Sequence, residues 1–161
     1  MAQTAKLDEL FTQLQSATDE EAGQISENIW IEWSKSGSPA MDLLLQRGRA
    51  ALAAGNPAEA IEHFTALIDQ DPTFAEAWNA RATAYFQTGD IGPSVNDIAH
   101  ALALNPRHFG ALSGLGMIFE ELDQPEKALE VYQAALAINP HMTDIRDAIT
   151  RLSSVISGQD L

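Results

Sequence analysis

The 161-residue sequence contains no cysteine, and it is poor in positive charge. Without cysteine it has no disulfide bond, no thiol nucleophile and no thiolate metal ligand. Its 9 Lys and Arg residues stand against 23 Asp and Glu residues, which gives a formal net charge of −14. A chain with so few cations lacks the basic patch that binds phosphates or anionic lipids. We therefore expect no nucleic-acid partner and no binding to anionic membranes.

Long hydrophobic runs are also absent. No apolar stretch approaches the length of a membrane span, and the first ten residues lack the hydrophobic core of a signal peptide. We therefore expect a soluble protein without membrane insertion, cytoplasmic from the chain as given. An exported, periplasmic location stays open if a leader has been removed, because Ala2 and Gln3 also fit the residues that follow a cleavage site.

The patterns that accompany catalysis or metal binding are missing too. The four histidines lack helical ligand spacing, and no nucleophile elbow or phosphate-binding glycine loop occurs. The acidic residues Glu120, Glu121 and Asp123 lie close together, but without the spacing of a calcium loop. We expect a protein that is not an enzyme, with no catalytic residue, no metal and no cofactor.

What the sequence does contain is a period. Pro72, Pro106 and Pro140 are spaced 34 residues apart, and each follows an acidic or amide residue. Gly55, Gly89 and Asp123 repeat at the same interval. A fixed period of this length indicates an array of helix pairs that bury their apolar faces against one another.

The period divides the chain into three segments, and no strand pattern competes with helix anywhere. Residues 1–38 are expected to form a helical hairpin, with Thr18 and Glu21 as a capping box for its second helix. Residues 39–142 hold three repeats, at about 41–74, 75–108 and 109–142. Residues 143–161 form a capping helix and tail, with an apolar side of Ile145, Ile149, Leu152 and Ile156.

Two interpretations of the N-terminal hairpin remain open. In the first, it covers the open apolar end of the repeat stack, as terminal units of such arrays do. In the second, Trp30 and Trp33 form an exposed patch for a partner or a second copy.

Two helix starts within the repeats are predicted from capping residues. Ser38 and Pro39 predict one, and Thr73 with Glu76 predicts another.

The repeats resemble the tetratricopeptide repeat (TPR) over roughly residues 41–142. The third repeat carries the pattern in Leu112, Leu115, Gly116, Phe119, Ala128, Tyr132, Ala135 and Pro140. The first carries it in Leu44, Gly48, Ala60, Phe64 and Pro72, with Ala51 at an aromatic position. The second has Trp78, Tyr85 and Pro106, but Ala82 replaces the usual Gly, Ser94 the usual Ala and Ile98 the usual aromatic residue.

The resemblance implies an all-α fold, a right-handed superhelical array of antiparallel helix pairs (TPR α-solenoid) with an N-terminal helical pair and a C-terminal capping helix. It also implies a concave groove, lined by the first helix of each repeat, that binds a peptide. The corresponding residues are Leu45, Arg49, Leu52, Glu76, Asn79, Thr83, Phe86, Gln87, Ser113, Met117, Glu120 and Glu121. Packing against neighbouring helices is an equally open interpretation of Leu52, Phe86 and Met117.

Charge at these positions favours a partner with basic residues, because Glu120 and Glu121 stand at one end of the groove. Some family members bind chaperone C-terminal carboxylates through lysines on these helices. Those lysines are missing here, so we do not expect a chaperone-tail adaptor. Outside the groove, Arg81 and Asp97 are predicted to form an ion pair within the second repeat, whereas Arg47 lacks such a partner.

Two functions follow from this reading. The first is a protein–protein interaction scaffold or adaptor that binds an unidentified protein or peptide in the groove. The alternative is a self-associating structural protein that uses its tryptophan-containing N-terminal helices. We expect a monomer or a weak homodimer.

Overall fold

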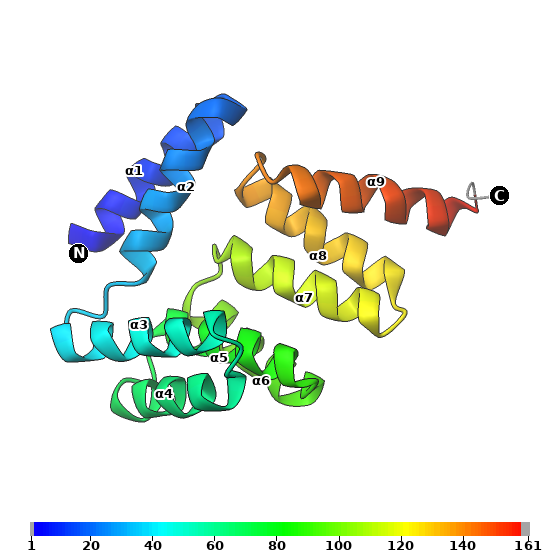
Figure 1. The fold of residues 1–161 in the computed structure, drawn as a ribbon. Coiled ribbons are helices and arrows are strands. Elements are labelled where there is room, and N and C mark those ends of the chain that lie inside the picture. Colours follow the sequence, from blue (N-terminus) through cyan, green and yellow to red (C-terminus); the bar gives the residue numbers. More distant parts are fainter. Residues whose placement is uncertain (1, 159–161) are drawn as a thin grey trace. The chain divides into compact units, whose positions relative to one another are not determined.

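The computed structural model describes residues 2–158. Within this range the chain consists of helices joined by short turns and contains no strand, which confirms the all-α class (Figure 1). The helices are α1 (Ala2–Ser16), α2 (Asp19–Trp33), α3 (Pro39–Ala53), α4 (Pro57–Gln70), α5 (Ala75–Thr88), α6 (Ile91–Leu104), α7 (Phe109–Glu121), α8 (Pro125–Ile138) and α9 (Thr143–Ser157). None of the helices in this part of the chain is long and apolar enough to cross a membrane.

The period in the sequence is also the period of the helices. The second helices of the repeats, α4, α6 and α8, begin at residues 57, 91 and 125, and each is 14 residues long. The turns before them contain Gly55, Gly89 and Asp123, whose φ angles are 79°, 80° and 53°. This left-handed conformation is free for glycine and tolerated by aspartate, which explains the residue types at this recurring position.

The turns between repeats show the same regularity. Asp71, Asn105 and Asn139 each accept a hydrogen bond from the backbone N–H two residues further on, at 3.0, 3.2 and 3.2 Å. Such a turn needs a short side chain with an acceptor oxygen. The acidic or amide residue before each repeated proline therefore shapes the turn that follows the second helix.

The described chain divides into two compact units. The two-repeat unit, residues 33–111, contains α3 to α6 and the first turn of α7. The terminal unit combines the two chain ends: α1 and α2 up to residue 32, and the chain from residue 112, which includes α8 and α9.

The two-repeat unit is built on a continuous apolar core between α3, α4 and α5. Its buried members are Leu45, Ala51, Ala60, Phe64, Leu67, Ile68, Phe74, Ala77, Ala80 and Ala84. In the first repeat a Cβ on Gly48 would lie 2.2 Å from the ring of Phe64. The second repeat has Ala82 on α5 and Ile98 on α6 at the corresponding positions. Alanine is larger than the glycine of the first repeat and isoleucine is smaller than its phenylalanine, so the two changes in volume oppose each other.

The terminal unit contains the third repeat and the capping helix. Here a Cβ on Gly116 would lie 2.3 Å from the ring of Tyr132, which repeats the contact of the first repeat. Buried Ile145 and Leu152 of α9 belong to one apolar cluster with Tyr132 and Ala128 of α8. Ile156, expected on the same apolar side, is 39% exposed, so the packed side of α9 ends before it.

Two of the predicted helix caps are present. The Thr18 N–H donates to the Glu21 carboxylate at 2.9 Å, and the Glu21 N–H donates to the Thr18 hydroxyl at 3.3 Å. At the start of α3, the Ser38 hydroxyl accepts from the Met41 N–H at 3.5 Å. Each cap satisfies backbone donors that the helix itself leaves unpaired.

Candidate functional site

All of the residues that the resemblance assigns to a peptide groove lie on α3, α5 and α7, the first helices of the repeats. Those on α3 and α5 belong to the two-repeat unit, and those on α7 belong to the terminal unit. They therefore form two candidate surfaces, one in each unit.

In the two-repeat unit, three of these residues lie inside the protein. Leu45 is 1% exposed and is a member of the apolar core, Glu76 is 2% exposed, and Asn79 is 9% exposed. Side chains this deeply buried pack beneath the candidate surface and are not exposed on it. The residues that reach solvent are half-buried Arg49, Leu52 and Phe86 and exposed Thr83 and Gln87.

Glu76 is the centre of a buried polar group, the Glu76 cluster, formed by Arg49, Glu76, Asn79 and His108. Its carboxylate accepts from Arg49 at 2.9 Å, from Asn79 at 3.3 Å and from His108 Nε2 at 2.7 Å. These hydrogen bonds compensate for removing a carboxylate from water. They also join α3 and α5 to the residue that precedes α7.

The contacts of His108 determine which of its nitrogens carries hydrogen. Nδ1 accepts a hydrogen bond from the backbone N–H of Ala111 at 3.0 Å, in the first turn of α7. Nε2 therefore carries the hydrogen and donates it to Glu76, so the ring is the neutral Nε2–H tautomer. The fully buried ring caps α7 with one nitrogen and supports the Glu76 cluster with the other.

Trp33 covers His108 within the same unit. The two rings are stacked with centroids 4.3 Å apart, and Trp33 is only 7% exposed. The sequence-based hypothesis of an exposed Trp30 and Trp33 patch is therefore wrong for Trp33. Its indole is used inside the protein and is not available to a second copy.

The capping box predicted from Thr73 and Glu76 is also wrong. Thr73 lies before the helix, where its N–H and hydroxyl both donate to Asp71 at 3.0 and 2.6 Å. Phe74 is the N-cap residue of α5 and makes no side-chain capping bond. Glu76 instead points into the protein, where its partners include a residue one repeat further along the chain.

In the terminal unit, the candidate surface lies along α7. Met117, near the middle of that helix, is 49% exposed although it is a large apolar side chain. Glu121 is exposed, and Ser113 is half-buried beside Met142. Met117 and Glu121 are thus an exposed apolar side chain and an exposed acidic one, four residues apart on the same helix.

Glu120 already has partners within the unit. It accepts from Arg151 of α9 at 2.6 Å and from the Tyr132 hydroxyl at 2.8 Å. The hydrogen bond from Arg151 is the main cause that lowers the pKa of the Glu120 carboxyl. Burial is the main cause that raises the pKa of the Tyr132 phenol, and the hydrogen bond to Glu120 raises it further.

Arg81 and Asp97, the residues that sequence analysis paired across the second repeat, are in direct contact. Arg81 donates to the two carboxylate oxygens at 2.7 and 2.9 Å, and Asp97 is 1% exposed. The hydrogen bond to Asp97 is also the main cause that raises the pKa of Arg81. The guanidinium additionally lies 5.2 Å from the ring centroid of Trp78. Arg47, which lacks the corresponding aspartate, is exposed.

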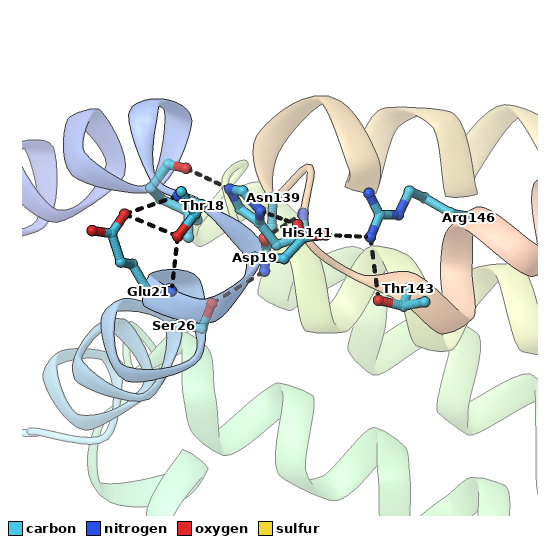
Figure 2. Close-up of polar contacts among 9 residues, drawn as sticks. Thr18, Asp19, Glu21, Ser26, Asn139, His141, Thr143 and Arg146 are labelled. Atoms are coloured by element: carbon cyan, nitrogen blue, oxygen red, sulfur yellow. Dashed lines mark hydrogen bonds and ion pairs between the residues drawn. The ribbon is translucent and has the colours of Figure 1, made fainter.

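Contacts that were not predicted from the sequence attach the N-terminal hairpin to the turn between α8 and α9 (Figure 2). The His141 ring contacts the Asp19 carboxylate at 2.6 Å and the Leu14 carbonyl at 2.9 Å. Arg146 donates to the other oxygen of Asp19 at 3.1 Å. We call these four residues the His141 latch. No local pattern predicts such contacts, because the partners are 122 to 127 residues apart.

Further polar contacts surround the latch. Gln15 donates to the backbone carbonyl of Ile138 at 2.8 Å, at the end of α8. Asn139 donates to the Ser26 hydroxyl at 3.4 Å. Within the terminal unit, the hairpin thus contacts the end of the third repeat, whereas its predicted role at the start of the stack stays a prediction.

The described residues, 2–158, contain no group of three or more His, Asp or Glu side chains that could hold a metal ion. The carboxylates that contact His108 and His141 each also bind an arginine, which neutralises their charge.

Comparison with known proteins identifies the repeats. Tetratricopeptide repeat models match residues 45–92 and 110–142. A TPR repeat-containing protein of Rhizobium etli is 34% identical over 154 residues, which are 95% of this chain and 76% of that protein. Small glutamine-rich tetratricopeptide repeat-containing protein 2 of Saccharomyces cerevisiae is 30% identical over 77% of this chain, but this chain covers only 36% of that protein.

A solved structure gives the same result. The first TPR of Spaghetti (RPAP3), which was determined bound to the HSP90 peptide SRMEEVD, matches with a TM-score of 0.69 and 26% identity, over 73% of this chain and 93% of that one. The helical period, the repeated Gly–aromatic contacts and these matches together show that the chain belongs to the tetratricopeptide repeat family.

Proposed function

We propose that this chain is a protein-interaction adaptor that binds a peptide or an extended segment of another protein on the first helices of its repeats, within residues 39–142. The observation that carries the proposal is Met117, which is 49% exposed in the middle of α7. The relative that was solved with an HSP90 peptide supports a peptide as the kind of ligand. The surface of α3 and α5, with exposed Thr83 and Gln87, is the second proposed contact region.

The proposed partner segment carries basic residues. Glu121 is exposed beside the Met117 surface, whereas Glu120 is already paired with Arg151. The formal net charge of −14 further attracts cationic segments and repels acidic ones. Charge of this kind mainly raises the association rate and fixes the orientation of the bound segment.

The negative charge and the existing contacts of Arg49 also support a ligand different from the acidic HSP90 peptide. Arg49, the cation among the α3 and α5 residues assigned to the surface, already donates to Glu76 and to Ser34. The places that correspond to the lysines and asparagines of carboxylate-binding family members hold no lysine here; they are Leu45, Arg49, Asn79, Thr83, Ser113 and Met117. Uncompensated carboxylates of an acidic peptide would therefore meet a surface that repels them.

The test uses peptides selected on the immobilised protein from a display library, with binding measured by fluorescence anisotropy. We expect selected peptides to be basic, and we expect SRMEEVD not to bind. Met117→Ala should weaken binding roughly tenfold, which corresponds to about 1.4 kcal/mol, because a central apolar contact is lost. Val155→Ala is the matched control, since Val155 is 47% exposed but lies on α9.

Two outcomes would contradict the proposal. Equal binding to the wild type and to Met117→Ala would remove α7 from the interaction surface. Tight binding of SRMEEVD would show that the surface accepts an acidic tail despite its charge. Circular dichroism of each variant checks that helicity is unchanged.

A further inference from the structure

His141 differs from an ordinary surface histidine because both of its ring nitrogens face hydrogen-bond acceptors. Nδ1 lies 2.6 Å from a carboxylate oxygen of Asp19, and Nε2 lies 2.9 Å from the backbone carbonyl oxygen of Leu14. Figure 2 shows the ring between the hairpin and the start of the capping helix. The His141 side chain is only 11% exposed, so water has little access to replace these contacts.

Neither acceptor can take over the role of donor. A peptide carbonyl has no hydrogen to give. The pKa of the Asp19 carboxyl is lowered, first by the hydrogen bond from His141 and then by Arg146, so Asp19 remains a carboxylate near neutral pH. A neutral imidazole has a single N–H, and one nitrogen lone pair would then face an oxygen lone pair. Only the imidazolium form of His141 makes both contacts.

The surroundings of the ring include groups that act in opposite directions. Asp19 lies in the first turn of α2 and favours the positive ring, whereas Arg146 of α9 is a like charge that is itself held by Asp19. The end of α8 at Ile138 and the start of α9 at Thr143 lie on either side of His141 in the chain. Their helix dipoles act on the ring with opposite signs.

We propose that the His141 latch is a protonation-dependent attachment that holds the N-terminal hairpin on the third repeat and weakens when the ring loses its proton. Histidine is the side chain whose charge ordinarily changes between about pH 5 and pH 8. The latch is complete while both ring nitrogens of His141 carry hydrogen, and it loses a charged hydrogen bond when the ring loses a proton. Loosening exposes the turn between α8 and α9, which is a surface separate from the proposed peptide-binding helices.

The absence of cysteine makes the proposal directly measurable, because two introduced cysteines are the sole sites for spin labels. Glu27→Cys on α2 and Gln133→Cys on α8 are both exposed positions within the terminal unit. Double electron–electron resonance then gives the distribution of distances between the hairpin and the third repeat. We expect one narrow distribution at about pH 5.5, and at about pH 8 a second, longer distance with the detached-to-docked ratio raised roughly tenfold.

Three variants separate the latch from other titrations. His141→Arg keeps a permanent charge with several donors, so its distribution should stay narrow at both pH values. His141→Gln has no ionisable group, so its distribution should not respond to pH. His63→Gln removes a histidine of the two-repeat unit and should behave as the wild type does.

The proposal is overturned if the wild-type distance distribution is the same at both pH values. It is equally overturned if His141→Gln retains the pH response, because another group would then be responsible. These results do not depend on any peptide ligand, so they are independent of the adaptor function proposed above.

Discussion

Each of the two units contains a carboxylate that contacts both an arginine and a histidine, but the two carboxylates lie in opposite settings. In the two-repeat unit, Arg49 and His108 flank the carboxylate of Glu76, and in the terminal unit Arg146 and His141 flank that of Asp19. The Glu76 side chain is 2% exposed, whereas that of Asp19 is 62% exposed. The Arg–carboxylate–His arrangement is thus buried in one unit and at the surface in the other.

The second nitrogen of each histidine determines what the arrangement does. In His108 it accepts from a backbone N–H, which fixes the ring as a neutral, structural group. In His141 it faces a carbonyl oxygen, which requires a second hydrogen on the ring. A short histidine–carboxylate distance therefore does not by itself show a charged pair, because the partner of the other ring nitrogen also determines the protonation state.

The largest expected effect comes from replacing the buried carboxylate of Glu76 by an amide. Glu76→Gln should lower the free energy of unfolding by about 3 kcal/mol, because it removes the buried charge opposite Arg49 and can place an N–H against that of His108. Asp19→Asn is the matched change at the surface, and it should lower the urea midpoint much less than Glu76→Gln does. Equal losses in urea unfolding would show that burial does not distinguish the two arrangements.

The next largest effects concern the glycine–aromatic contacts, which are alike in both units. Gly48→Ala and Gly116→Ala should each cost about 2 kcal/mol, since each new methyl group would overlap an aromatic ring on the facing helix. Adding Phe64→Ile to Gly48→Ala recreates the Ala82 and Ile98 pair of the second repeat and should restore part of the loss. Unequal costs for the two glycines, by thermal and urea unfolding, would mean that the repeats are packed differently in the two units.

The smallest expected effect is a dependence on acid that is confined to the terminal unit. The pKa values of Asp19 and Glu120 are lowered by hydrogen bonds from His141 and Arg151, respectively. Folding lowers these values, so the stabilisation is present above the unfolded-state pKa, near 4, and is lost as pH falls through the folded-state values. The difference in urea midpoint between wild type and the double variant Asp19→Asn, Glu120→Gln should therefore shrink between about pH 6 and pH 3. A constant difference would argue against both ion pairs.

Much of the fold was predictable because its determinants repeat locally. The left-handed turn position and the residue before each proline recur every 34 residues, and the Gly–aromatic pair occurs in the first and third repeats, so several copies of one pattern support the same assignment. Two of the departures in the second repeat, Ala82 and Ile98, follow one physical rule, because the larger residue on α5 (alanine in place of glycine) faces a smaller one on α6 (isoleucine in place of an aromatic residue). The ion-pair geometry of Arg81 and Asp97 follows from the same regular positions.

The candidate site was less predictable because its determinants are not local. Glu76 follows Thr73 at the spacing of a capping box, yet it turns inward to His108, 32 residues later. Its neighbours in sequence carry no sign of that partner. The sequence likewise leaves open whether Trp33 is exposed, because the rings that cover it, His108 and Phe109, lie far away in the chain. The packing of one repeat on the next thus decided which of the predicted groove residues reach solvent.

The composition of the terminal unit from both chain ends also has a consequence for synthesis on the ribosome. Helices α1 and α2 leave the ribosome before the repeats do, and the turn to which His141 belongs follows more than 120 residues after Asp19. At ordinary translation rates that interval is on the order of ten seconds. During it the first and second repeats can assemble, the second on the first. The hairpin, although made before the repeats, reaches its final place only after the third repeat has been made.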